Sequence, residues 1–145
     1  MTYALVARLH GLLAALGLAI LLHPVLNLRG KRAKTWWTRF TVDASAVLLG
    51  LPFAVGWFLY PIYRVEVKTK LRGTAPDALL RFESKEHLAA MAVALVVGGA
   101  MVLRLSGDGD AGRRASWTLL ACGWGLGLIA ALLGVWVGGH AHPGW

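Results

Sequence analysis

The sequence predicts an all-α, polytopic integral membrane protein folded as an antiparallel bundle of four transmembrane helices. Of its 145 residues, 57% are hydrophobic and only 15% are charged, and the mean hydropathy is +0.60. This composition excludes a disordered chain and is too apolar for an ordinary soluble domain. Four stretches without a formal charge approach the roughly 20 residues that a helix needs to cross a bilayer. None alternates with a period of two, which disfavours a transmembrane barrel.

These uncharged stretches define the expected helices in order. They cover residues 9–28, 44–63, 88–103 and 115–139. With their flanking turns we expect helices over about residues 4–28, 42–63, 85–105 and 115–139, in a single membrane domain spanning 1–145. The first stretch is too long for the apolar core of a signal peptide and lacks a cleavage signature, so we interpret it as a retained helix.

The connections between the helices differ in length. Residues 64–84 form the only long one, an outer loop in which Pro76 could open a short helix on the membrane surface. Thr41 or Asp43 could cap the second helix, and Ser84 could cap the third. The polar, glycine-rich turn 106–112 joins the last two helices as an antiparallel pair.

Positive charge sets the expected orientation. One side of the bundle holds Arg29, Lys31, Arg32, Lys34, Arg39, Arg104, Arg113 and Arg114. The other holds Arg8, Arg64, Lys68, Lys70, Arg72, Arg81 and Lys85. The loop between the first two helices holds five cations within about a dozen residues and no acid, whereas the long connection also carries Glu66, Asp77 and Glu83. This higher density of positive charge predicts that the first side is cytoplasmic. We therefore expect a bacterial cytoplasmic membrane with both termini outside. The net charge of +8 then faces lipid headgroups, and the expected partner is the lipid bilayer rather than nucleic acid.

Small residues recur along the last helix. Gly123, Gly127, Gly134 and Gly138 follow one another along one stripe, as in small-x-x-x-small packing motifs. Helices in lipid associate mainly through close packing, so this stripe predicts a helix contact. A glycine face also offers room for a flat cofactor, and the two interpretations can hold at different depths.

Histidines are the main functional candidates, because a polar side chain inside a membrane destabilises the protein unless it has a partner. The outer side carries His10, His87, His140 and His142, whereas His23 lies 13 residues beyond His10. That separation is about 20 Å along a helix, so His10 and His23 cannot share one centre.

His10 and His87 each begin a stripe of small side chains. Gly17 follows His10, while Ala94 and Gly98 follow His87 at helical spacing. Two imidazoles beside such space suit haem b, because neutral imidazole is an axial ligand of haem iron. Arg8 and Lys85 lie on the same side and would hold the propionates. The alternative is that both histidines are simply hydrogen-bonded polar groups near the headgroups.

The pair His140 and His142 suits copper or zinc, with His10 or His87 completing the ligand set. The alternative is a solvated tail. The sequence has no hydrolytic or nucleotide-binding motif, and a redox role stays open.

Taken with the topology, two features carry a family resemblance: His10 with Gly17 in the first helix, and Lys85-Glu86-His87 at the start of the third. The chain resembles CopD-like membrane proteins and, more distantly, HemJ-type protoporphyrinogen oxidases. The second resemblance implies functional roles for His10 and Lys85.

Two functional hypotheses follow. The first is a haem b protein, with copper as the alternative metal, acting in electron transfer or cofactor handling within a membrane complex. The second is a cofactor-free accessory subunit whose glycine stripe docks onto other membrane subunits.

Overall fold

The computed structural model describes residues 2–30, 35–106 and 109–141. Within these ranges the protein is all-helical and contains no strand. The elements in order are α1 (Thr2–Arg29), α2 (Trp36–Ile62), the π-helical turn η1 (Tyr63–Val67), α3 (Lys68–Thr74), α4 (Pro76–Leu105) and α5 (Asp110–Ala141). The predicted all-α class is therefore confirmed.

Four helices, α1, α2, α4 and α5, are long and apolar enough to cross a membrane. Only 22–28% of the most apolar window in each is buried inside the chain. Large side chains such as Leu12, Phe58 and Val135 are consequently exposed. A surface of this kind is unfavourable in water over so large an area and is suited to lipid.

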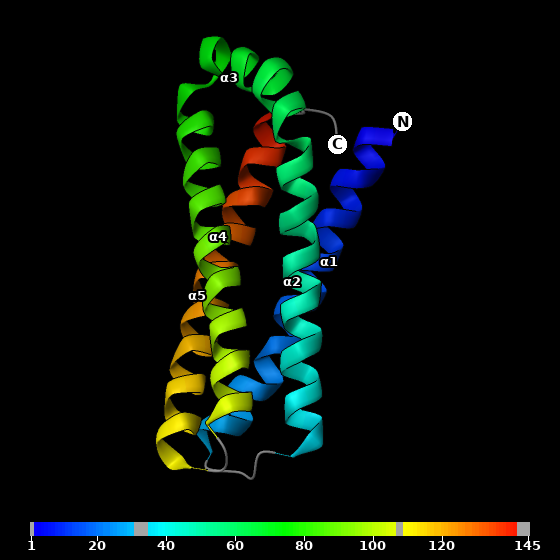
Figure 1. Cartoon of the computed structure of the whole chain (residues 1–145). Coiled ribbons are helices and arrows are strands. Elements are labelled where there is room, and N and C mark those ends of the chain that lie inside the picture. The colour runs from blue at the N-terminus through cyan, green and yellow to red at the C-terminus, as the bar shows by residue number, and fades with distance from the viewer. Residues whose placement is uncertain (1, 31–34, 107–108, 142–145) are drawn as a thin grey trace.

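The four long helices form a bundle in which α1 packs on α2 and α5, and α4 packs on α5 and α2 (Figure 1). The start of α1 and the end of α5 lie at the same end of the bundle as α3. We call this the α3 end. The end of α1, the start of α2, the end of α4 and the start of α5 lie at the opposite end, which we call the turn end.

The helix boundaries differ from the sequence prediction between residues 64 and 84. This segment is helical almost throughout rather than an open loop, because η1, α3 and the first turns of α4 occupy it. Proline suits the first helical position and a carboxylate the first turn, so Pro76 and Asp77 start α4 earlier than expected. Ser84 is therefore not a cap, and its hydroxyl donates to the Leu80 carbonyl at 2.9 Å.

The second helix also begins earlier than predicted. Thr35 precedes α2, and its Oγ1 accepts a hydrogen bond from the Thr38 backbone N–H at 3.2 Å, as an N-cap does. Thr41 and Asp43 therefore lie inside α2. Thr41 donates instead to the carbonyls of Trp37 and Thr38, both at 3.0 Å.

The bundle interior is apolar and closely packed. Its buried cluster includes Leu18, Leu21, Leu28, Val42, Leu49, Val96, Leu103 and Leu120. Glycines on α5 allow the close approach of its neighbours. A Cβ at Gly123 would lie 2.8 Å from Val96 Cγ2 of α4, and one at Gly127 would lie 2.8 Å from Leu18 Cδ2 of α1. These two glycines pack within the chain itself.

Hydrogen bonds between helices add to this packing. The Ser116 hydroxyl on α5 donates to the Gly99 carbonyl of α4 at 2.8 Å. The indole of Trp124 on α5 donates to the Leu18 carbonyl of α1 at 3.1 Å. Because lipid offers no competing water, such bonds help to specify which helices are neighbours.

Candidate functional site: a polar cluster inside the α3 end

Lys85 places a cation within the apolar length of α4. The side chain is half-buried, and a Cβ at Gly134 of α5 would lie 3.4 Å from Lys85 Cδ. The ammonium lies 4.5 Å from the centroid of the Phe82 ring, in cation–π range. Its charge interacts with His10 on α1 and with the neighbouring Glu86. An ionisable residue in a candidate membrane span is costly, which marks it as a functional candidate.

His10 faces α2. Its ring lies beside the backbone of Pro52. Because proline has no N–H, the polar backbone group at this point is the Pro52 carbonyl, which can only accept a hydrogen bond. A Cβ at Gly56, one turn further along α2, would lie 3.7 Å from His10 Cε1. The absence of a side chain at Gly56 therefore leaves room for the ring.

A carbonyl beside an imidazole can orient the ring. A neutral histidine that donates one N–H to a carbonyl has a lone pair on its other nitrogen. Metal-binding histidines in proteins are commonly oriented in this way. With the Pro52 carbonyl beside it and the positive charge of Lys85 acting on it, His10 is a candidate ligand.

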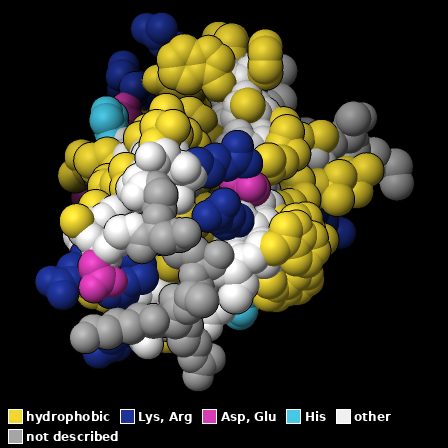
Figure 2. Space-filling model, turned by 60° about the horizontal axis from the view of Figure 1, so that its bottom comes forward, with side chains coloured by type: hydrophobic (Ala, Val, Ile, Leu, Met, Phe, Trp, Pro, Cys, Tyr) yellow, Lys and Arg dark blue, Asp and Glu magenta, His cyan; other side chains and the backbone are white. Residues whose placement is uncertain are grey.

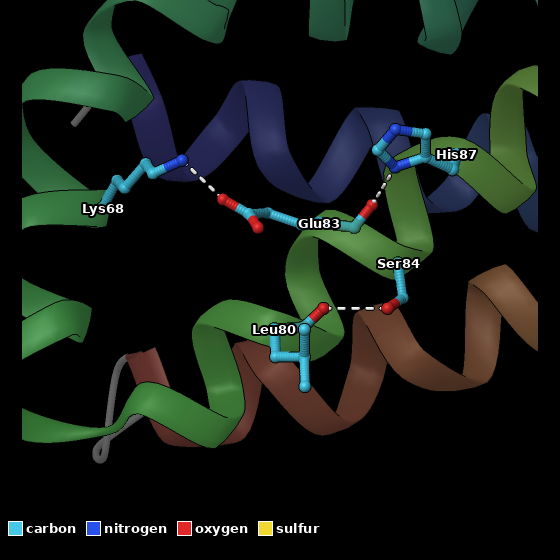
Figure 3. A network of polar contacts seen from close by, with 5 residues as sticks. All are labelled: Lys68, Leu80, Glu83, Ser84 and His87. Atoms are coloured by element: carbon cyan, nitrogen blue, oxygen red, sulfur yellow. Dashed lines mark hydrogen bonds and ion pairs between the residues drawn. The ribbon is translucent and has the colours of Figure 1, made fainter.

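His87 has a different environment on α4. It is exposed, and its Nδ1 donates to the Glu83 carbonyl one turn earlier at 2.8 Å (Figure 3). The Glu83 carboxylate forms an ion pair with Lys68 of α3. The structure therefore brings His10 together with Lys85, whereas the contacts described for His87 belong to α4 and its junction with α3.

The other predicted cofactor residues are dispersed. Arg8 and Ala94 are exposed. Gly17 is buried against α2, where a Cβ would lie 3.0 Å from Leu49 Cγ. A Cβ at Gly98 would lie 3.9 Å from Leu119 Cδ1 of α5. Side chains of neighbouring helices thus lie beside both glycines.

The terminal residues are only partly described. His140 and Gly138 belong to the last turns of α5, and His142 lies outside the described residues. Among the residues that the structure does describe, no group of three or more His, Cys, Asp and Glu side chains is close enough to hold a metal ion. The predicted pairing of His140 with His142 falls beyond that range.

Aromatic contacts surround the cluster at the α3 end. Tyr63 of η1 stacks on Phe82 of α4 with ring centroids 3.9 Å apart. The guanidinium of Arg81 lies 4.4 Å from the Trp136 ring of α5. These contacts join η1, α4 and α5 close to Lys85. The sequence reasoning missed Phe82 as a neighbour of the ammonium, although its i, i+3 spacing from Lys85 could have indicated it.

His23 has a structural environment near the turn end. The Asn27 side-chain amide donates to His23 Nε2 at 2.9 Å. With Nε2 as the acceptor, Nδ1 carries the proton and donates to Thr41 Oγ1 at 3.3 Å. Both ring nitrogens are therefore used, Nε2 in a bond within α1 and Nδ1 in a bond that joins α1 to α2.

The Pro52 and Gly56 contacts were also missed by sequence reasoning, and both are distinctive residues within an apolar helix. Proline and glycine inside a membrane helix often mark a place where another group approaches the backbone.

Comparisons with known protein families, curated proteins and solved structures find no match for this chain.

Proposed function

We propose that the chain crosses the cytoplasmic membrane of a bacterium four times as an antiparallel bundle, with the turn end in the cytoplasm and both termini outside. Lipid-facing side chains on all four long helices support insertion. Trp36, Trp37 and Phe40 are exposed and lie against one another near the turn end. Aromatic side chains of this kind concentrate at membrane interfaces.

We further propose that the polar cluster at the α3 end binds haem b, with His10 as an iron ligand and Lys85 as the partner of a propionate. The observation that carries this proposal is that the His10 imidazole of α1 feels the charge of the half-buried Lys85 ammonium of α4 at the same end of the bundle. Haem combines an apolar ring with carboxylates, which matches a half-buried cation among apolar and aromatic side chains. A bound haem would supply one-electron redox chemistry, in electron transfer or cofactor handling.

The residues fit this assignment to different degrees. His10 would present one nitrogen to the iron, with the Pro52 carbonyl beside the ring to accept the proton of the other. His87 fits less well as a second ligand. Its ring is exposed and its Nδ1 donates to the Glu83 carbonyl, so the ring would have to turn inward to reach the haem. Copper bound through His10 is the alternative metal, because imidazole also suits copper.

Absorption spectroscopy of the purified full chain, as isolated and after titration with haemin, tests the proposal. We expect a Soret band in the wild type and its loss in His10→Gln. His23→Gln is the matched control, because His23 is on the same helix and its contacts lie towards the other end. A wild-type chain that stays colourless and does not take up haemin would disprove haem binding, and copper in metal analysis would then favour the alternative.

The accessory-subunit hypothesis stays a prediction, although two glycines of its stripe pack inside the chain. It relied on a glycine stripe free to dock partners, but Gly123 and Gly127 contact α4 and α1 of the same chain. Docking to other membrane subunits stays a prediction for surfaces outside this stripe.

A further inference from the structure

A basic pocket lies at the turn end, far along the bundle from the His10–Lys85 cluster. It has a volume of about 220 Å³ and lies between the last turn of α1 and the first turns of α5. Its lining residues are Leu28, Arg29, Arg113, Arg114 and Trp117. Sites for drug-sized ligands measure roughly 300–1,000 Å³, so this pocket suits a smaller group. Figure 2 shows Lys and Arg side chains gathered on this end of the molecule, between hydrophobic surfaces.

Arg113 forms the fixed wall of the pocket. It is only 7% exposed, and its Nη1 donates to the Leu28 carbonyl at 2.6 Å. Nε and Nη2 both donate to Asp110 Oδ1, at 3.3 and 3.1 Å. The Asp110 carboxylate thus offsets the charge of this one arginine and holds its guanidinium in place.

The other two arginines have no such partner. Arg29 and Arg114 are exposed, and the structure shows no ion pair to an acid for either among the described residues. Three guanidinium groups therefore line the pocket, and in the part of the chain that the structure describes Asp110 is the one carboxylate paired with them. The excess positive charge favours an anionic ligand.

Trp117 also lines the pocket. Its indole Nε1 is buried and has no acceptor among the described residues. A buried N–H without an acceptor lowers stability. The ring beside the pocket therefore carries an unused hydrogen-bond donor.

The surface next to the pocket is apolar. Leu22 and Leu26 precede Arg29 by seven and three residues, so all three lie on one face of α1. Both leucines are exposed, at 38% and 58%. A ligand held by Arg29 would therefore have an apolar track beside it, as a headgroup followed by acyl chains requires.

We propose that this pocket binds the phosphate group of one anionic phospholipid, with Arg29 and Arg114 as ligands and its acyl chains along Leu22 and Leu26. Basic pockets between membrane helices are typical sites for acidic headgroups. The proposal rests on membrane insertion but not on haem binding. Spectra of the haem site and lipid binding at the turn end can therefore fail separately.

Native mass spectrometry of the full chain in mild detergent tests it, with phosphatidylglycerol and phosphatidylcholine offered in equal amounts. We expect the wild type to retain one phosphatidylglycerol in preference to phosphatidylcholine. The double variant Arg29→Gln/Arg114→Gln should lower that affinity about thirtyfold, the value expected from removing two cations at an anionic lipid surface. Arg39→Gln/Arg72→Gln is the matched control, since it removes the same charge from exposed positions outside the pocket.

Three outcomes would overturn the proposal. The first is an unchanged preference for phosphatidylglycerol in the Arg29→Gln/Arg114→Gln variant, and the second is an equal loss of that preference in the control variant. The third is displacement of the lipid by inorganic phosphate at the same concentration, which would reassign the pocket to a free anion. Arg29→Lys/Arg114→Lys keeps the charge and should keep most of the binding, which separates loss of charge from loss of fold. Trp117→Phe keeps an aromatic ring but removes the N–H together with part of the indole, and it should weaken binding without changing elution volume.

Discussion

The guanidinium of Arg113 donates to the main-chain carbonyl of Leu28 at 2.6 Å, joining the start of α5 to the end of α1. Both residues are buried, at 7% and 1% exposure. The last carbonyls of a helix have no partner within it, so this bond satisfies an acceptor that would otherwise be unpaired. It also brings together two chain segments 85 residues apart.

Replacing Arg113 by Met should therefore destabilise the protein by about 2–3 kcal/mol, because the Leu28 carbonyl and Asp110 lose a charged donor. The measurement is unfolding in mixed micelles of detergent and SDS, without added anionic lipid. Arg114→Met, at the adjacent exposed position, should change stability by less than about 0.5 kcal/mol. Equal losses in the two variants would show that the bond contributes nothing specific.

Gly123 and Gly125 offer a matched pair on α5. A Cβ at Gly123 would lie 2.8 Å from Val96 Cγ2 and 3.1 Å from the Ala92 carbonyl, whereas nothing lies within 4 Å of one at Gly125. Gly123→Ala should therefore cost about 1–3 kcal/mol through overpacking. Gly125→Ala should be neutral or stabilise the helix by up to about 1 kcal/mol. The same unfolding assay compares them, and a neutral Gly123→Ala would contradict the close α4–α5 contact.

Lys85 should affect stability and binding in opposite directions. Lys85→Met removes a half-buried charge and should leave the ligand-free protein as stable as the wild type or more stable. Haemin affinity should fall roughly tenfold or more, because a propionate loses its charged partner. Lys85→Arg keeps the charge and should retain more affinity than Met. Haemin titrations and unfolding curves on the same samples give both quantities, and unchanged affinity in Lys85→Met would remove Lys85 from the site.

The proposed orientation predicts the location of the chain's ends. Alkaline phosphatase fused after Trp145 should be active, and a fluorescent protein at the same place should be dark, because the C-terminus lies outside. A truncated fusion after Gly30, at the turn end, should give the reverse pattern. If the phosphatase fused at Trp145 is inactive and the fluorescent protein at Trp145 is bright, the bundle is inserted the other way. The basic pocket then faces outward.

Much of the helical architecture could be read from charge and hydropathy alone. The long uncharged stretches predict four apolar helices, and this prediction is confirmed. Helix boundaries were less predictable where polar residues continue a helix. The segment 64–84 reads as a loop because it is charged, yet Pro76 and Asp77 favour a helix start that the hydropathy does not reveal.

The candidate site was only partly predictable for a related reason. His10 and Lys85 could be singled out because polar groups are costly in an apolar helix. The partners of His10 could not, because the Pro52 carbonyl and the space at Gly56 depend on how α1 is rotated against α2. His87, by contrast, bonds within its own helix.

The sequence by itself determined that this chain forms long apolar helices with basic ends, because that property depends only on composition along the chain. The tertiary structure alone decided which residues meet. It placed His10 within reach of the charge of Lys85 and Arg113 against Leu28. Such pairs depend on the rotation and depth of each helix relative to its neighbours, which close packing at positions such as Gly123 and Gly127 sets.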